Sequence, residues 1–132
     1  MTPPAAAGGA GRVPVAGLVD EVAQRHGAVV VVCPSDLVIA GERARLRQLL
    51  DELCAAALRA GAGALRIAAQ GRPGAVALHV EADRCGDAGG DDTRAMAVAW
   101  ARCGGTFRCL RLLRALRFTV ELPAAWHGTT TA

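Results

Sequence analysis

Apolar side chains recur at a spacing of three or four residues in three segments, which is the pattern of amphipathic helices. The clearest segment is Glu42–Ala60, where a single apolar stripe continues for about five turns. Val15–His26 and Thr93–Arg102 are shorter examples, and each of the three segments is followed within two residues by glycine. We therefore expect three helices. The stripe of the longest one consists of Leu46, Leu49, Leu50, Leu53, Cys54 and Ala57.

Strand patterns lie between and after these helices. The β-branched run Ala28–Cys33, closed by Pro34, predicts a buried strand, and Leu37–Ile39 predicts a short one. Two further pairs of segments alternate apolar and less apolar residues, which is typical of antiparallel strands with one buried face. These pairs are Ala64–Ala69 with Ala75–Ala82, around a turn at residues 70–74, and Thr106–Leu112 with Leu116–Leu122.

The order of these elements predicts the fold class. Helices mixed with mostly antiparallel strands favour a two-layer α/β sandwich, in which helices cover one face of a mixed sheet. The other sheet face then has to meet solvent or a partner. We expect one domain at residues 14–123, a disordered arm at residues 1–13, where Pro, Ala and Gly leave little to bury, and a frayed tail at residues 124–132.

Composition excludes several classes of protein. Hydrophobic types make up 52% and charged types 20% of the chain, which is typical of a folded domain. No apolar run is long enough to cross a bilayer, and the first residues lack the basic region of a signal peptide, so we expect a cytoplasmic protein. The five cysteines form no C-x-x-C pair and predict neither a zinc site nor a disulfide framework. A net charge of +3 is too small to indicate nucleic-acid binding by itself.

Four motifs follow one another in an order that points to a known family. They are the helical segment Arg45–Leu53, the acidic turn that begins at Asp83, the segment Cys103–Phe107 with its Gly-Gly pair, and Phe118–Pro123 with its closing Leu-Pro. In this order they resemble the nucleotide-binding helix, the D-x-G-x-G motif, the H-G-G motif and the last strand of histidine-kinase-type ATPase domains, which have the Bergerat fold. The resemblance covers residues 15–123 and implies the histidine kinase ATPase-like fold.

This resemblance implies a set of nucleotide-binding residues. Glu52 stands where the family has an acid or Asn that can position water, and it is our candidate catalytic residue. Asp83 stands where the family's carboxylate accepts a hydrogen bond from adenine, and Gly86, Gly90 and Thr93 fall in the segments that approach the nucleotide. Two ordinary interpretations stay open beside these, because an acid on a helix or after a strand is often simply exposed.

The same resemblance predicts that the phosphate site is damaged. The family has an Asn one turn after the Glu52 position, where it helps to hold Mg²⁺, and an alanine methyl offers no oxygen ligand. Glycines of the family are replaced, and carboxylates are added where phosphates would lie. Since each loss is worth roughly 1–3 kcal/mol, we expect weak or absent ATP binding and no bound Mg²⁺ or other metal. The changed positions are Ala56, Cys85, Asp87, Asp91 and Asp92.

Two functions follow from these expectations. The first is a degenerate, pseudokinase-like domain that acts in two-component-like signalling by binding a protein, such as a response regulator, a sigma-factor system or a kinase subunit. The alternative is a stand-alone ATP-binding kinase domain, of the histidine kinase or anti-sigma-factor kinase type, that a partner chain completes. None of the histidines, His26, His79 and His127, precedes the domain on a helix of its own, so we do not expect autophosphorylation within this chain.

Arginines near the C-terminus recur every three residues. One interpretation is a hairpin with a basic exposed face, and the other is a basic helix that docks on nucleic acid, an acidic partner or a membrane surface. A nucleic-acid-associated protein is therefore a third hypothesis, although few aromatic residues lie nearby to stack on bases. The four residues are Arg108, Arg111, Arg114 and Arg117.

Overall fold

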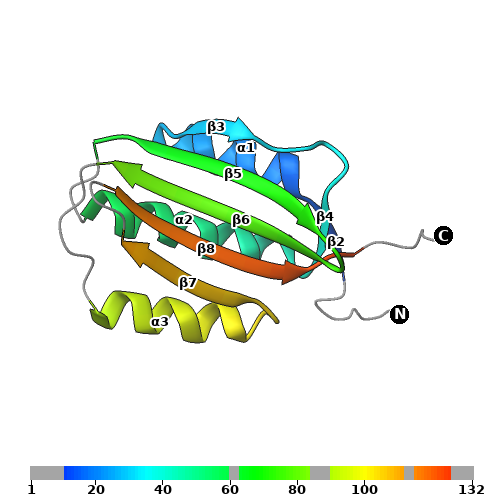
Figure 1. Ribbon diagram of the computed structural model, residues 1–132. Helices are drawn as coiled ribbons and strands as arrows, with labels where there is room; N and C mark the ends of the chain where they lie inside the picture. Colours follow the sequence, from blue (N-terminus) through cyan, green and yellow to red (C-terminus); the bar gives the residue numbers. More distant parts are fainter. Residues whose placement is uncertain (1–10, 60–62, 84–89, 112–114, 126–132) are drawn as a thin grey trace.

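Three helices lie against a five-stranded sheet in the part of the chain that the computed structural model describes, residues 11–59, 63–83, 90–111 and 115–125 (Figure 1). The sheet order is β3-β5-β6-β8-β7, and only β3 and β5 run parallel. The predicted mixed, mostly antiparallel α/β sandwich is confirmed. The elements are β2 Arg12–Pro14, α1 Val15–His26, β3 Val29–Val32, β4 Val38–Ala40, α2 Arg43–Arg59, β5 Leu65–Arg72, β6 Ala75–Asp83, α3 Gly90–Ala101, β7 Thr106–Arg111 and β8 Ala115–Pro123.

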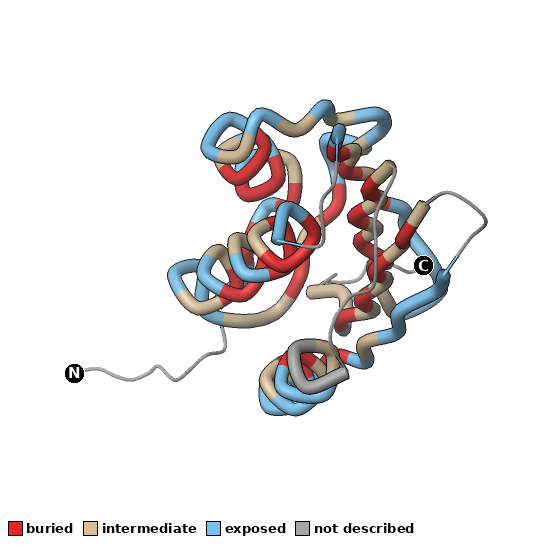
Figure 2. Tube along the Cα trace, turned by 90° about the vertical axis from the view of Figure 1, so that its left-hand side faces the viewer, coloured by how far each residue is buried: buried red, intermediate tan, exposed pale blue. Residues whose placement is uncertain are grey.

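The helices form as the apolar periodicity predicts. In α1 every residue of the stripe is buried, and the helix ends at Gly27, whose φ of 67° is the left-handed conformation that glycine adopts at low cost. In α2 the whole predicted stripe from Leu46 to Ala57 is buried, together with Ala56. In α3 we expect Met96, Ala99 and Trp100 to face inward; Met96 and Trp100 are buried, and Ala99 is half-buried against the core. All three helices cover the same side of the sheet, and the buried positions in Figure 2 lie between the two layers.

The β5–β6 hairpin is longer than the sequence predicts. Its ladder continues through Gln70↔Ala77 and Gly71↔Val76 to Arg72↔Ala75, so only Pro73 and Gly74 form the turn. Gly74 has a φ of 72°, a left-handed conformation that glycine adopts at low cost and that a tight turn with proline at its first central position requires at its second. The predicted turn at residues 70–74 is therefore wrong in length, because cross-strand hydrogen bonds extend both strands toward it.

Strand β3 is exposed, and the prediction that Ala28–Cys33 forms a buried strand is wrong. Val29, Val31 and Val32 are each more than half exposed. The reason is the position of β3 at the edge of the sheet, where it pairs with β5 alone and its register shifts between Val30 and Val32. A run of valines predicts a strand, but it does not say which neighbours will cover it.

The two ends of the domain are tied together by a small second sheet. Strand β2 pairs with β4 antiparallel, and Val13 is buried, so Arg12 and Val13 belong to the fold although we placed them in the predicted arm. At the other end, the backbone N–H groups of Ala124 and Ala125 donate hydrogen bonds to Gly74 and Val38. Ala124 and Ala125 thus belong to the fold, although we placed them in the predicted tail. No helix in the described ranges is long and apolar enough to span a bilayer.

Two glycines give a matched test of this packing. An added Cβ at Gly105 would lie 2.8 Å from Cδ2 of Leu122 and 3.1 Å from the carbonyl oxygen of Glu121, whereas a Cβ at Gly17 would meet nothing within 4 Å. Gly105→Ala should therefore lower the free energy of unfolding by about 1–3 kcal/mol. Gly17→Ala in α1 should raise it by up to about 1 kcal/mol through helix propensity. Urea denaturation of both variants measures this, and equal effects of the two substitutions would contradict the described packing.

Candidate functional site

The predicted nucleotide-binding helix borders a groove between α2 and α3. Glu52 and Arg59 of α2, with Ala95 and Met96 of α3, line a hollow of about 290 Å³. The apolar stripe of α2 faces the sheet, which turns Glu52 toward solvent at the margin of that stripe. The structure thus places Glu52 in a hollow between α2 and α3, and its role in nucleotide binding stays a prediction.

The described lining of the groove is small and offers few oxygen ligands. The volume of the groove falls at the lower end of ligand pockets, which hold about 300–1,000 Å³. Ala56, one turn after Glu52, is 5% exposed and offers a methyl where a metal would need oxygen. Within the described residues, no group of three or more His, Cys, Asp or Glu side chains could hold a metal ion.

The structure places Asp83 on the opposite side of the sheet from this groove. Its two carboxylate oxygens accept hydrogen bonds from the Nη1 and Nη2 atoms of Arg66 at 2.9 and 2.7 Å. Ala82, its neighbour, is fully buried on the helix side, since successive residues of a strand face opposite ways. The structure does not bring Asp83 and Glu52 together. Adenine recognition by Asp83 stays a prediction, and the direction of its side chain argues against it.

The remaining predicted nucleotide residues lie around the start of α3. Gly86 falls outside the described residues, as do Cys85 and Asp87. Gly90 begins α3, and Thr93 follows within its first turn, half-buried. Gly90 and Thr93 thus belong to the first turn of the helix that forms one wall of the groove.

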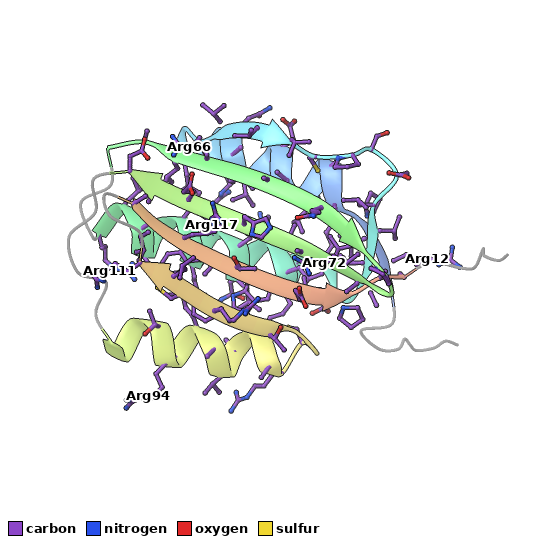
Figure 3. The ribbon with its side chains drawn as sticks, viewed as in Figure 1. Arg12, Arg66, Arg72, Arg94, Arg111 and Arg117 are labelled. Atoms are coloured by element: carbon purple, nitrogen blue, oxygen red, sulfur yellow. The ribbon has the colours of Figure 1, made fainter. Side chains whose placement is uncertain are left out.

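An ion-pair network covers the face of the sheet that carries no helix, here called the open face. Arg66 bridges Asp83 and Glu81, with 2.9 Å between Nη2 and the Glu81 carboxylate, and Arg117 reaches the same carboxylate at 3.0 Å. Hydrogen bonds from Arg66, and next from Arg117, lower the pKa of Glu81. Hydrogen bonds to Asp83 and then to Glu81 raise the pKa of Arg66. Figure 3 looks onto this face and shows Arg66, Arg117 and Arg72 along it.

Sequence reasoning missed this network, although the signal was available. Arg66 lies on β5, and His79, Glu81 and Asp83 follow one another at every second position of β6. A period of two on an antiparallel pair places such residues on one face. The alternation had been used only to find the apolar side of these strands.

His79 lies at the middle of the open face. Its Nδ1 atom and Oγ1 of Thr119 on β8 share a hydrogen bond of 3.0 Å. Burial lowers the pKa of His79, and the positive charges of Arg117 and Arg72 lower it further, against opposing effects of Glu121 and Glu81. The imidazole is therefore neutral near neutral pH.

The arginines near the C-terminus belong to a hairpin, and the alternative of a basic helix is wrong for the three that the structure describes. Arg108 and Arg117 lie at open-face positions of β7 and β8, opposite Thr119 and Leu110 respectively. Arg111 lies opposite Leu116, at a position on the helix side. Strands alternate with a period of two, so residues three apart fall on opposite faces. Arg114 lies outside the described residues.

Comparison with known proteins shows the fold. No protein-family model and no curated protein matches the sequence. Among solved structures, the ATP binding domain of PrrB from Mycobacterium tuberculosis has a TM-score of 0.75 and 20% identity over 90% of this chain and 100% of that one. The histidine kinase AdeS of Acinetobacter baumannii has a TM-score of 0.71 and 18% identity, covering 87% and 67% of the two chains.

A third similar structure is that of the histidine kinase ThkA in complex with the response regulator TrrA. Its TM-score is 0.65 at 16% identity, over 86% of this chain and 41% of that one. At these identities the likenesses establish architecture. The chain has the fold of histidine kinase ATP-binding domains, as the order of its motifs predicted.

The lowered pKa of His79 gives a pH-dependent prediction. As pH falls through 6.5, the unfolded state takes up a proton before the folded state does, so the free energy of unfolding should decrease. His79→Gln removes this proton uptake and should flatten the stability profile between about pH 7 and pH 5. Urea denaturation across this range measures the slope. Parallel profiles for the variant and the wild type would show that burial does not perturb His79.

Proposed function

We propose that this chain is a degenerate histidine-kinase-type domain that binds ATP weakly or not at all and acts by binding a protein partner. The proposal rests on the side chains that α2 has at the groove. Where the resemblance expects two polar residues one turn apart, the chain has Glu52 and the buried methyl of Ala56. A Mg²⁺ ion held against phosphates needs oxygen ligands in near-octahedral geometry, and Glu52 is the one carboxylate of α2 that lines the groove.

The opposite placement of Asp83 supports the same proposal. A carboxylate that receives two charge-assisted hydrogen bonds from one guanidinium is held in place by them. It would have to give up this pairing and reach around the end of β6 to meet a nucleotide beside α2. On the helix side, the last residue of β6 is Ala82, whose side chain has no hydrogen-bonding group.

The similar structures support a signalling context. ThkA is a histidine kinase seen in complex with a response regulator, and PrrB contributes an ATP binding domain. By this likeness the partner of the present chain is a response regulator, a kinase subunit or a component of a sigma-factor system. A scaffold that keeps its packing while losing ligand oxygens can still present such surfaces.

A second function rests on one observation. Arg59 lines the groove two turns after Glu52 on the same helix, so a cation that could attract phosphate accompanies the acid that could position water. In this alternative the chain is an ATP-binding kinase domain of the histidine kinase or anti-sigma-factor kinase type, and a partner chain supplies the missing polar groups.

Isothermal titration with Mg·ATP separates the two functions. We expect no heat of binding for this chain up to millimolar nucleotide, because a charged hydrogen bond left unmade costs about 1.5–3 kcal/mol and several are missing. The PrrB ATP binding domain is the positive control. Micromolar binding that disappears in Glu52→Gln would instead establish the kinase alternative. In that case Asp83→Asn reports whether Asp83 takes part from its own side of the sheet.

A further inference from the structure

The open face of the sheet carries two adjoining hollows that together cross it from one edge to the other. The first, of about 340 Å³, lies between Val31 of β3 and Arg117 of β8. The second, of about 280 Å³, lies between Arg72 of β5 and Leu110 of β7. His79 and Arg117 line both hollows, so the two form one groove, here called the open-face groove.

Guanidinium groups stand outermost along this groove. Arg117 is 40% exposed and its partner Glu81 only 22%, and Arg72 is 47% exposed against 32% for Glu121. The carboxylates thus lie beneath the arginines that neutralise them. Arg108 adds a further exposed guanidinium at the second hollow, and it makes no ion pair with the described residues.

These guanidinium groups keep hydrogen-bonding capacity for a ligand. A guanidinium has five N–H donors. The hydrogen bonds of Arg117 to Glu81 use Nε and Nη2, and the ion pair of Arg72 with Glu121 is made through Nε. Nη1 of Arg117 and both Nη atoms of Arg72 make no hydrogen bond with the described part of the chain. Carboxylates are the ligands that such planar donors recognise best in a protein.

Exposed apolar side chains stand at both ends of the groove. Val31 on one edge strand and Leu110 on the other are each more than half exposed. Four spacings between neighbouring strands separate β3 from β7, a distance of about 19 Å. An extended peptide covers this distance in about six residues.

We propose that the open-face groove docks an acidic segment of a partner protein, with carboxylates over Arg72, Arg108 and Arg117 and an apolar residue at each end. This proposal deepens the proposed function, on which it rests, by assigning the surface and the chemistry of the partner. A protein segment fits better than a nucleic acid. Exposed apolar side chains at both ends of the groove match a peptide, and the described aromatic residues, Trp100, Phe107 and Phe118, are buried or partly buried and unavailable for base stacking.

The test uses the fluorescein-labelled peptide Leu-Glu-Glu-Glu-Glu-Glu-Leu, whose two leucines match the two ends of the groove. Fluorescence anisotropy should show saturable binding to the full chain, weakened by added salt. Arg108→Gln and Arg72→Gln should each weaken binding about tenfold through the loss of a charge-assisted hydrogen bond. Replacing both leucines of the peptide with glycine should weaken it as well.

Arg94→Gln is the matched control, because it removes the same charge from the exposed surface of α3, away from the groove (Figure 3). It should leave peptide binding unchanged. No binding of the peptide, or an equal effect of Arg94→Gln and Arg108→Gln, would overturn the proposal. Tighter binding of an oligothymidylate than of the peptide would assign the groove to nucleic acid and overturn it too.

Measuring both peptide binding and Mg·ATP binding on the same protein tests the docking surface and the proposed loss of ATP binding separately. The groove between α2 and α3 and the open-face groove lie on opposite sides of the sheet, so a titration with Mg·ATP does not report on peptide binding. Absent peptide binding with absent Mg·ATP binding overturns the docking surface alone. Peptide binding together with micromolar Mg·ATP binding overturns the degenerate nucleotide site alone and leaves the docking surface established.

Discussion

All three described helices pack on one face of the sheet, and this one-sided arrangement decides what each strand residue can do. Along β6, every second side chain is buried against the helices, and its neighbours belong to the open face. The helix side holds the apolar core and the groove beside α2. The open side holds the ion pairs, His79 and the row of arginines. A shift of one residue in register would exchange the two sets, so the burial of the core fixes the polar face as well.

The one-sided arrangement also separates the residues that hold α2 in the fold from those that line its groove. The core contacts of α2 come from its leucine stripe, which is intact and buried. Ala56 adds a buried methyl and high helix propensity at a position where an amide would need hydrogen-bond partners. Removing ligand oxygens from the margin of a helix therefore stabilises the domain or leaves its stability unchanged. Fold and ligand binding depend on different faces of the same helix.

The polar residues of the open face contribute less to stability than the apolar residues of the core. The arginines and carboxylates of the open face neutralise one another within the sheet, and pairs this exposed add little to stability. They form a surface on which arginine N–H donors point outward and carboxylate acceptors lie beneath them. Apolar residues on both edge strands border this surface. Such a surface gives specificity toward a partner more than it gives affinity.

Local sequence determined the elements of this protein. Apolar periods of about 3.6 and of two are properties of a single segment, and they predicted the three helices, the two hairpins and the buried stripe of α2. They also placed Glu52 on the solvent margin of its helix. The order of motifs along the chain then predicted the histidine kinase ATPase-like fold, which the similar structures share.

Tertiary structure decided which neighbour covers each element. The valines of β3 are exposed because that strand lies at the edge of the sheet, and Asp83 faces Arg66 because the ladder with β5 sets the direction of its side chain. The same ladder extended the hairpin to Pro73, and the pairing of β7 with β8 placed the described arginines near the C-terminus on two faces. The apolar periodicity of a segment is set by its own residues. Whether the segment is buried depends on neighbours that are far away in the chain, and no local pattern contains that information.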